Sequence, residues 1–155
     1  MSRNQEGEIR GHNFSALDNS LQIALAHMVE ILREECRCPQ VRAELDGWAV
    51  SACVRDLGIW IDRGWPDEAY AEVRRAALEA VDRVRTHGAY ETEDVATWSL
   101  GEKLTVTGGF LRVRPFPIAP IVEVLEAFAQ MLEKDAPPVP PGEDPENASL
   151  GYDCS

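Results

Sequence analysis

The sequence predicts an α+β domain that is predominantly α-helical, with about four helices, and carries a small antiparallel β-hairpin or three-stranded meander. Apolar residues recur at steps of three and four along most of residues 14–134, which is the period of amphipathic helices. Over residues 104–113 the period changes to two around a Gly-Gly pair, as expected for a hairpin. Hydrophobic residues make up 45% of the 155, which is enough for the core of one domain.

The first helix is expected to follow a short polar segment. Residues 1–13 lack the apolar core of a signal peptide, and we interpret them as a flexible N-terminal arm. Ser15 fits an N-cap, and an apolar stripe begins two residues later. The stripe consists of Leu17, Leu21, Ala24, Leu25, Met28, Leu32 and Cys36. Pro39 ends this helix, because the residue before a proline avoids the α region.

The second helix is expected to run from Pro39 to Gly64 and to organise the core. Its apolar stripe contains two tryptophans and again steps by three and four. The stripe is made of Val41, Leu45, Trp48, Ala49, Ala52, Cys53, Leu57, Trp60 and Ile61. Proline suits the first position of a helix and glycine the position after its last turn.

Two features of this span are unusual for a core helix. Small residues form a second face, and they are Gly47, Ser51, Val54 and Gly58. Such a face favours close packing of helices, or it leaves a groove that admits a ligand or partner. Asp56 falls on the apolar stripe, so we expect its carboxylate to be buried and paired with an arginine or a backbone N–H group. The alternative is a functional acid.

The third helix and the connector after it follow. Pro66 suits the first helical position, and Gly88 suits the position after the last turn. Residues 89–94 then form an acidic connector.

A hairpin and a last helix complete the domain. Residues 104–113 are expected to form the hairpin, with Gly108-Gly109 as its two-residue turn. The alternation of Ala96, Trp98 and Leu100 adds a third strand, and its turn lies at Gly101. A last amphipathic helix runs from Ile118 to about Lys134.

The composition divides the chain into three parts. Residues 14–134 form the single globular domain, between the arm of residues 1–13 and a tail of residues 135–155. The tail holds five prolines and five acidic residues but neither Lys nor Arg. We interpret it as an extended, Pro-rich acidic segment.

Charge and hydropathy indicate which partners and which location to expect. The net charge of −12 disfavours nucleic acid as a partner, because phosphates are repelled, and it favours a basic protein instead. The sequence lacks a run of 18 apolar residues, so a membrane-spanning helix is not expected. We expect a cytoplasmic protein, in which the four cysteines are reduced thiols.

No arrangement of residues points to catalysis, to a metal or to a cofactor. Cys36 and Cys38 are two residues apart, but a zinc site needs four ligands and a second Cys/His pair of suitable spacing is lacking. His27 shares a helical side with Glu30 and Glu34, which is more typical of a surface histidine than of a metal ligand. A nucleophile, a base and an oxyanion donor do not come together in any motif.

Three functions remain open. The first is a small acidic protein that binds and inhibits or regulates a basic protein partner, of which an immunity protein or antitoxin against a toxin enzyme is the concrete version. Its partner-binding residues would be Glu91, Glu93, Asp94, Trp98 and Glu102. The second is a homo-oligomeric structural or accessory subunit. The third is a small-ligand-binding protein or enzyme. Its helical pocket would be lined by Trp48, Asp56, Trp60 and His27.

Overall fold

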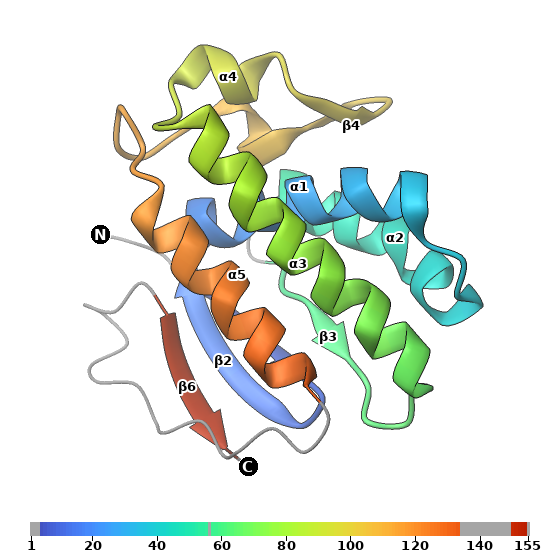
Figure 1. Ribbon diagram of the computed structural model, residues 1–155. Coiled ribbons are helices and arrows are strands. Elements are labelled where there is room, and N and C mark those ends of the chain that lie inside the picture. Colours follow the sequence, from blue (N-terminus) through green and yellow to red (C-terminus); the bar gives the residue numbers. More distant parts are fainter. Residues whose placement is uncertain (1–3, 56, 134–149, 155) are drawn as a thin grey trace.

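The computed structural model describes residues 4–55, 57–133 and 150–154, and it confirms the α+β class (Figure 1). The helices are α1 (Asp18–Glu35), α2 (Pro39–Cys53), α3 (Asp67–His87), α4 (Thr92–Ala96) and α5 (Ala119–Leu132). The strands are β1 (Asn4–Ile9), β2 (His12–Leu17), β3 (Trp60–Ile61), β4 (Ser99–Gly101), β5 (Leu104–Thr105) and β6 (Leu150–Cys154). A short 3-10 helix, η1, spans Val106–Gly109.

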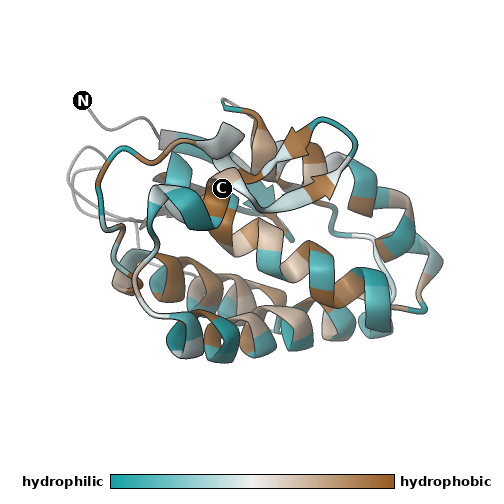
Figure 2. Cartoon of the chain, turned by 90° about the horizontal axis from the view of Figure 1, so that it is seen from above, coloured by the Kyte–Doolittle hydropathy of each residue, from teal (hydrophilic) through white to brown (hydrophobic). Residues whose placement is uncertain are grey.

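The helices form a layer around α1. Helix α1 packs against α2, α3 and α5, while α3 and α5 lie side by side (Figure 1). Hydrophilic residues gather on the outward sides of the helices (Figure 2). Every residue of α1 from Asp18 to Val29 is buried, which explains why its apolar pattern is wider than one stripe. Among the described residues, no helix is both long and apolar enough to cross a membrane.

A four-stranded sheet with the strand order β3-β1-β2-β6 lies against this layer. Strands β1 and β2 are antiparallel and joined by a tight turn at Arg10-Gly11, where both residues have positive φ, of 52° and 85°. Strand β3 runs parallel to β1, and β6 pairs antiparallel with β2. Helix α5 covers the inner face, where the Phe14 and Phe128 rings meet edge to face at 5.2 Å.

The flexible arm predicted for residues 1–13 is wrong from residue 4 onward. Strand β1 alternates Gln5, Gly7 and Ile9, all buried, with the outward-facing Glu6 and Glu8. Its inner face carries only one large apolar side chain, so the alternation was too weak to recognise. The backbone of this strand pairs with β2 along its whole length and with β3 at Glu8 and Ile9, and that pairing is a tertiary feature.

The long helix predicted for residues 39–64 ends early, at Cys53. The chain then crosses to the sheet and forms β3. A Cβ added to Gly58 would lie 1.7 Å from the Glu6 carbonyl oxygen, and one added to Gly7 would lie 2.2 Å from the Ile59 oxygen. Because neither glycine has a Cβ, the backbone of β1 and the backbone of residues 58–59 can approach each other. The small-residue face therefore does not exist as one helical surface, and the Ser51 hydroxyl donates to the Gly58 carbonyl at 2.9 Å.

The hairpin predicted around Gly108-Gly109 is also wrong, although a small antiparallel hairpin is present. It consists of β4 and β5, which turn at Gly101 as the alternation around Trp98 predicted. Residues Thr107, Gly108 and Gly109 all have positive φ, of 56°, 66° and 77°, so the chain coils into η1 at the point where strands would pair. Val106 and Leu111 are buried, as their apolar character requires.

A largely buried ion pair between Arg112 and Asp18 connects the segment after η1 to the start of α1. The Arg112 Nε donates to Asp18 Oδ1 at 3.0 Å and to Oδ2 at 2.9 Å, and the backbone N–H of Arg112 donates to Asn19 Oδ1 at 2.9 Å. Asp18 and Asn19 are almost fully buried. This contact joins positions 94 residues apart in the chain.

Candidate functional site

The acidic connector folds into the start of the short helix α4. The backbone N–H of Glu91 donates to Asp94 Oδ2 at 2.7 Å, and the Glu91 side chain accepts from the backbone N–H of Asp94. This reciprocal pair is a capping box. Two of the predicted partner-binding carboxylates therefore hold the helix itself.

Two other predicted carboxylates are exposed, and the elements that carry them lie at the same end of the molecule (Figure 1). Glu93 lies on α4 and Glu102 in the β4–β5 turn, and both are exposed. Trp98 lies between the two elements and is half-buried. Its indole Nε1 donates to Glu30 Oε1 of α1 at 2.7 Å, which fixes the ring. We call Glu91, Glu93, Asp94, Trp98 and Glu102 the acidic face.

A buried hydrogen bond lies beneath the acidic face. It joins His27 Nε2 of α1 to the Tyr90 hydroxyl at 2.6 Å. Burial, with smaller contributions from Arg83 and His87, lowers the pKa of His27 to about 4, so the ring is neutral at pH 7. Burial, with a smaller contribution from Asp94, raises the pKa of Tyr90 well above its usual range. This bond is therefore one between neutral groups.

Aromatic rings stack around this hydrogen bond. The His87 ring lies parallel to the Tyr90 ring, with centroids 3.9 Å apart and an angle of 6° between the planes. The Trp98 ring is also nearly parallel to the Tyr90 ring, with centroids 6.4 Å apart and an angle of 8°. His27 contacts the Trp98 ring at 4.6 Å. His87 Nε2 also lies 3.8 Å from Asp94 Oδ2. The stack connects the middle of α1 and the C-terminal end of α3 to the acidic face.

Sequence reasoning placed these residues in separate roles. It assigned His27 to a helical pocket, and Trp98 and Asp94 to a partner surface, whereas the structure brings all three to one cluster. Tyr90 was not singled out at all. Its signal was weak, since it is one aromatic residue in an acidic connector.

Trp48, Trp60 and His27, the other residues of the pocket predicted around Asp56, have separate surroundings in the structure. Trp48 is 3% exposed and stacks on Trp65, with centroids 6.3 Å apart. Trp60 lies on β3 and is 58% exposed, and His27 is bonded to Tyr90. Asp56 lies outside the described residues, so its expected burial and pairing stay a prediction.

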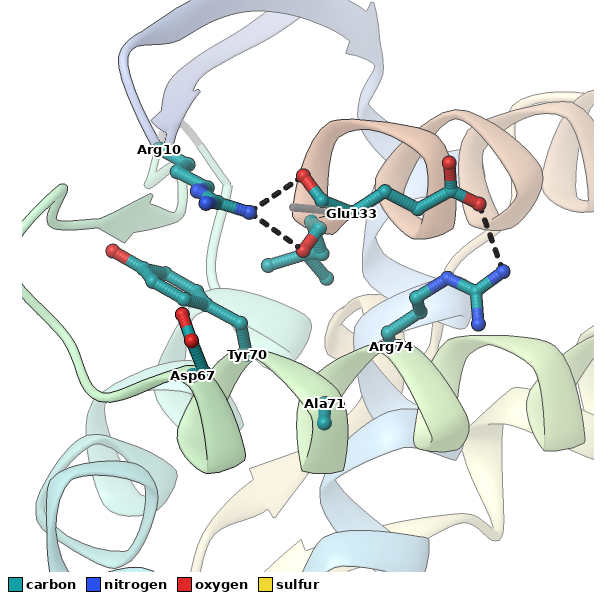
Figure 3. A pocket seen from close by; sticks show the side chains of 7 residues that line it. Arg10, Asp67, Tyr70, Ala71, Arg74 and Glu133 are labelled. Atoms are coloured by element: carbon teal, nitrogen blue, oxygen red, sulfur yellow. Dashed lines mark hydrogen bonds and ion pairs between the residues drawn. The ribbon is translucent and has the colours of Figure 1, made fainter. Parts of the chain in front are cut away.

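A pocket of about 440 Å³ opens elsewhere, at the end of α5 (Figure 3). Arg10 Nη1 donates to the carbonyl oxygens of Leu132 at 3.1 Å and of Glu133 at 2.5 Å, while its guanidinium lies 4.6 Å from the Tyr70 ring centroid. Arg74 Nη2 donates to Glu133 Oε1 at 2.9 Å. Both arginines therefore hold the C-terminal end of α5, where a cation is favourable. Asp67 and Ala71 complete the lining.

Three of the four cysteines are buried in the described part of the chain. Cys36, Cys38 and Cys53 are free thiols, and burial raises the pKa of Cys53 to about 11. Among the described residues, no group of three or more His, Cys, Asp or Glu side chains is placed to hold a metal ion. The Cys38 Sγ instead donates to Gln40 Oε1 at 3.0 Å.

Comparison with known proteins adds no assignment: no family model, no curated protein and no solved structure matches the chain.

Proposed function

We propose that this protein binds a basic protein partner through the acidic face and thereby inhibits or regulates it. An immunity protein or antitoxin that neutralises a toxin enzyme is the concrete form of this function. The observation that carries the proposal is the position of Glu93 and Glu102, which are exposed on two elements that flank a fixed, half-buried tryptophan.

The acidic face is ordered before any partner arrives. The capping box fixes α4, and the hydrogen bond from the Trp98 indole to Glu30 fixes the orientation of that ring. A surface that is already ordered loses less conformational entropy on binding. Tryptophan is also among the residue types that most often dominate the binding energy of an interface.

The charge of the whole chain supports the same partner. With a net charge of −12, the protein attracts a basic molecule over distances of about one Debye length, roughly 8 Å at physiological ionic strength. Such attraction raises the association rate more than the final affinity. The proposal therefore includes fast, salt-sensitive binding.

The test is co-purification from cells of the source organism at low and at high salt, followed by mass spectrometry. We expect one stoichiometric basic protein, which is reduced at high salt and reduced again with Glu93→Gln/Glu102→Gln. The matched control is Glu34→Gln/Glu35→Gln, which removes the same charge from exposed positions at the end of α1. Recovery of the protein only with itself, or equal loss with both double variants, would contradict the proposal.

A further inference from the structure

The four-stranded sheet has helices on one face, and its other face carries an exposed tryptophan. Along β1 the buried residues alternate with Glu6, which is exposed, and Glu8, which is half-buried. On β3, Trp60 is 58% exposed and the next residue, Ile61, is buried. The strand register places Trp60 beside Glu8 and places Asn13 of β2 on the other side of Glu8. We call Glu6, Glu8, Asn13, Ser15 and Trp60 the outer sheet face.

The indole of Trp60 lies along this face and does not project away from it. A Cβ added to Gly58 would lie 3.0 Å from Trp60 Cη2 and 1.7 Å from the Glu6 carbonyl oxygen. The six-membered ring is therefore above the Gly58 backbone and next to β1. Since the residue is more than half exposed, part of the ring is open to solvent.

The connection that leads into β3 also exposes large apolar side chains. Val54 is 46% exposed and Leu57 is 39% exposed, so three of the six exposed large hydrophobic residues in the described part of the chain fall within residues 54–60. Adjacent exposed apolar residues mark interaction sites more often than scattered ones do.

The two arginines nearest in sequence to β3, Arg55 and Arg63, contact residues outside the outer sheet face. The Arg55 guanidinium lies 5.6 Å from the Phe110 ring centroid. The Arg63 side chain lies beside Gly11, where a Cβ would be 2.2 Å from its Nε. The outer sheet face itself has two carboxylates and neither Lys nor Arg.

Charge decides which molecule this face suits. In a twofold dimer built on it, Glu6 and Glu8 would approach their own copies, and two chains of net charge −12 would meet. A guanidinium or ammonium group gains from both features of the face, because it is attracted to an indole ring and to carboxylates. Arginine gains most, since its planar group stacks on a ring while its N–H groups reach a carboxylate.

We propose that the outer sheet face binds an arginine-containing segment of a basic protein, with one guanidinium stacked on Trp60 and paired with Glu8 or Glu6. The inference rests on the proposed function only in that the partner is basic. It adds a second contact surface, formed by β1 and β3 and separate from the acidic face on α4 and the β4–β5 turn.

The test is an NMR titration of ¹⁵N-labelled full-length protein with acetylated tri-arginine amide. Tri-citrulline amide is the probe control, because it keeps the shape and loses the charge. We expect a saturable shift of the Trp60 indole N–H and of the Glu6 and Glu8 amides with tri-arginine, and none with tri-citrulline. The indole signals of Trp48, which is buried in the core, and of Trp65, which is partly buried and stacks on it, serve as internal references.

Two variants separate binding from folding. Trp60→Ala should weaken tri-arginine binding about 2- to 5-fold, the usual size of a cation–π contact at an exposed site. Glu6→Gln/Glu8→Gln keeps the ring and should weaken binding at least as much. Overturning results are shifts that appear only on the acidic face, equal shifts with tri-citrulline, or a dimer in sedimentation that Trp60→Ala dissociates. The outcome for Glu93→Gln/Glu102→Gln in co-purification does not enter this readout, so the two proposals fail separately.

Discussion

Glu72 of α3 accepts a hydrogen bond from the backbone N–H of Cys38, the residue that precedes α2. The distance from the Cys38 nitrogen to Glu72 Oε2 is 3.2 Å, and the Arg37 nitrogen lies 3.0 Å from Oε1. Helix α2 lacks a side-chain cap from its own N-cap residue. A carboxylate from a different helix therefore ties down the start of α2, where negative charge is favourable.

Removing this carboxylate should destabilise the fold. Glu72→Ala leaves two backbone N–H groups without their acceptor, and we expect a loss of about 1–2 kcal/mol in the free energy of unfolding, measured with urea. Asp82→Asn is the control, because Asp82 is exposed on the same helix. Equal effects of the two changes would show that Glu72 acts only through the charge of α3.

His27 should make the protein less stable in mild acid. Its folded pKa is about 4, below the ordinary value of 6.5, so the unfolded chain takes up a proton first as the pH falls. Stability is therefore lost as the pH falls from about 6.5 towards 4, by on the order of 3 kcal/mol. His27→Gln should flatten this part of the curve relative to wild type in urea unfolding at pH 4–7. An unchanged slope would show that His27 does not stay neutral in the folded protein.

Two glycines should respond in opposite directions to the same substitution. Gly58→Ala places a Cβ 1.7 Å from the Glu6 oxygen, so β3 must move, and we expect a loss of about 3 kcal/mol or more in thermal or urea unfolding. Gly47 lies within α2, and a Cβ added there would have no heavy atom within 4 Å outside its own helix turn. Gly47→Ala should stabilise the protein by about 0.5–1 kcal/mol. A tolerated Gly58→Ala would contradict the close approach of the chain to β1.

The buried pair of Asp18 and Arg112 should matter far more than an exposed pair. Asp18→Asn leaves a guanidinium that is largely buried without its carboxylate, and we expect a loss of about 3 kcal/mol. Arg85→Gln breaks an exposed pair with Glu126 and should cost less than about 0.5 kcal/mol. Both changes alter one charge, so the difference in their unfolding free energies isolates the effect of burial.

The sequence predicted the elements whose pattern is local. Helices α1, α3 and α5 show an uninterrupted helical period. Helix α1 ends before Pro39, and α3 lies between Pro66 and Gly88. The error in α2 has a physical cause: Leu57 and Trp60 continue the helical step, although the chain has already left the helix. After α2 the chain brings Gly58 and Ile59 alongside β1, and a helical period carries no trace of this contact.

The candidate sites were less predictable for the same reason. His27 and Tyr90 are 63 residues apart, and Glu30 and Trp98 are 68 apart, so only the folded chain brings them together. The outer sheet face depends on recognising β1, whose inner face has a single large apolar residue. By contrast, the exposure of Glu93 and Glu102 followed directly from their charge.

The parallel pairing of β1 with β3 also constrains how the chain folds during synthesis. Glu8 and Trp60 lie about 50 residues apart, so the hairpin of β1 and β2 leaves the ribosome well before its neighbour exists. Closing a loop of this length costs conformational entropy that only later contacts recover. Until α2 and the crossing at Gly58 have been made, the free edge of β1 can pair with other strands, so assistance from chaperones would be most valuable in that interval.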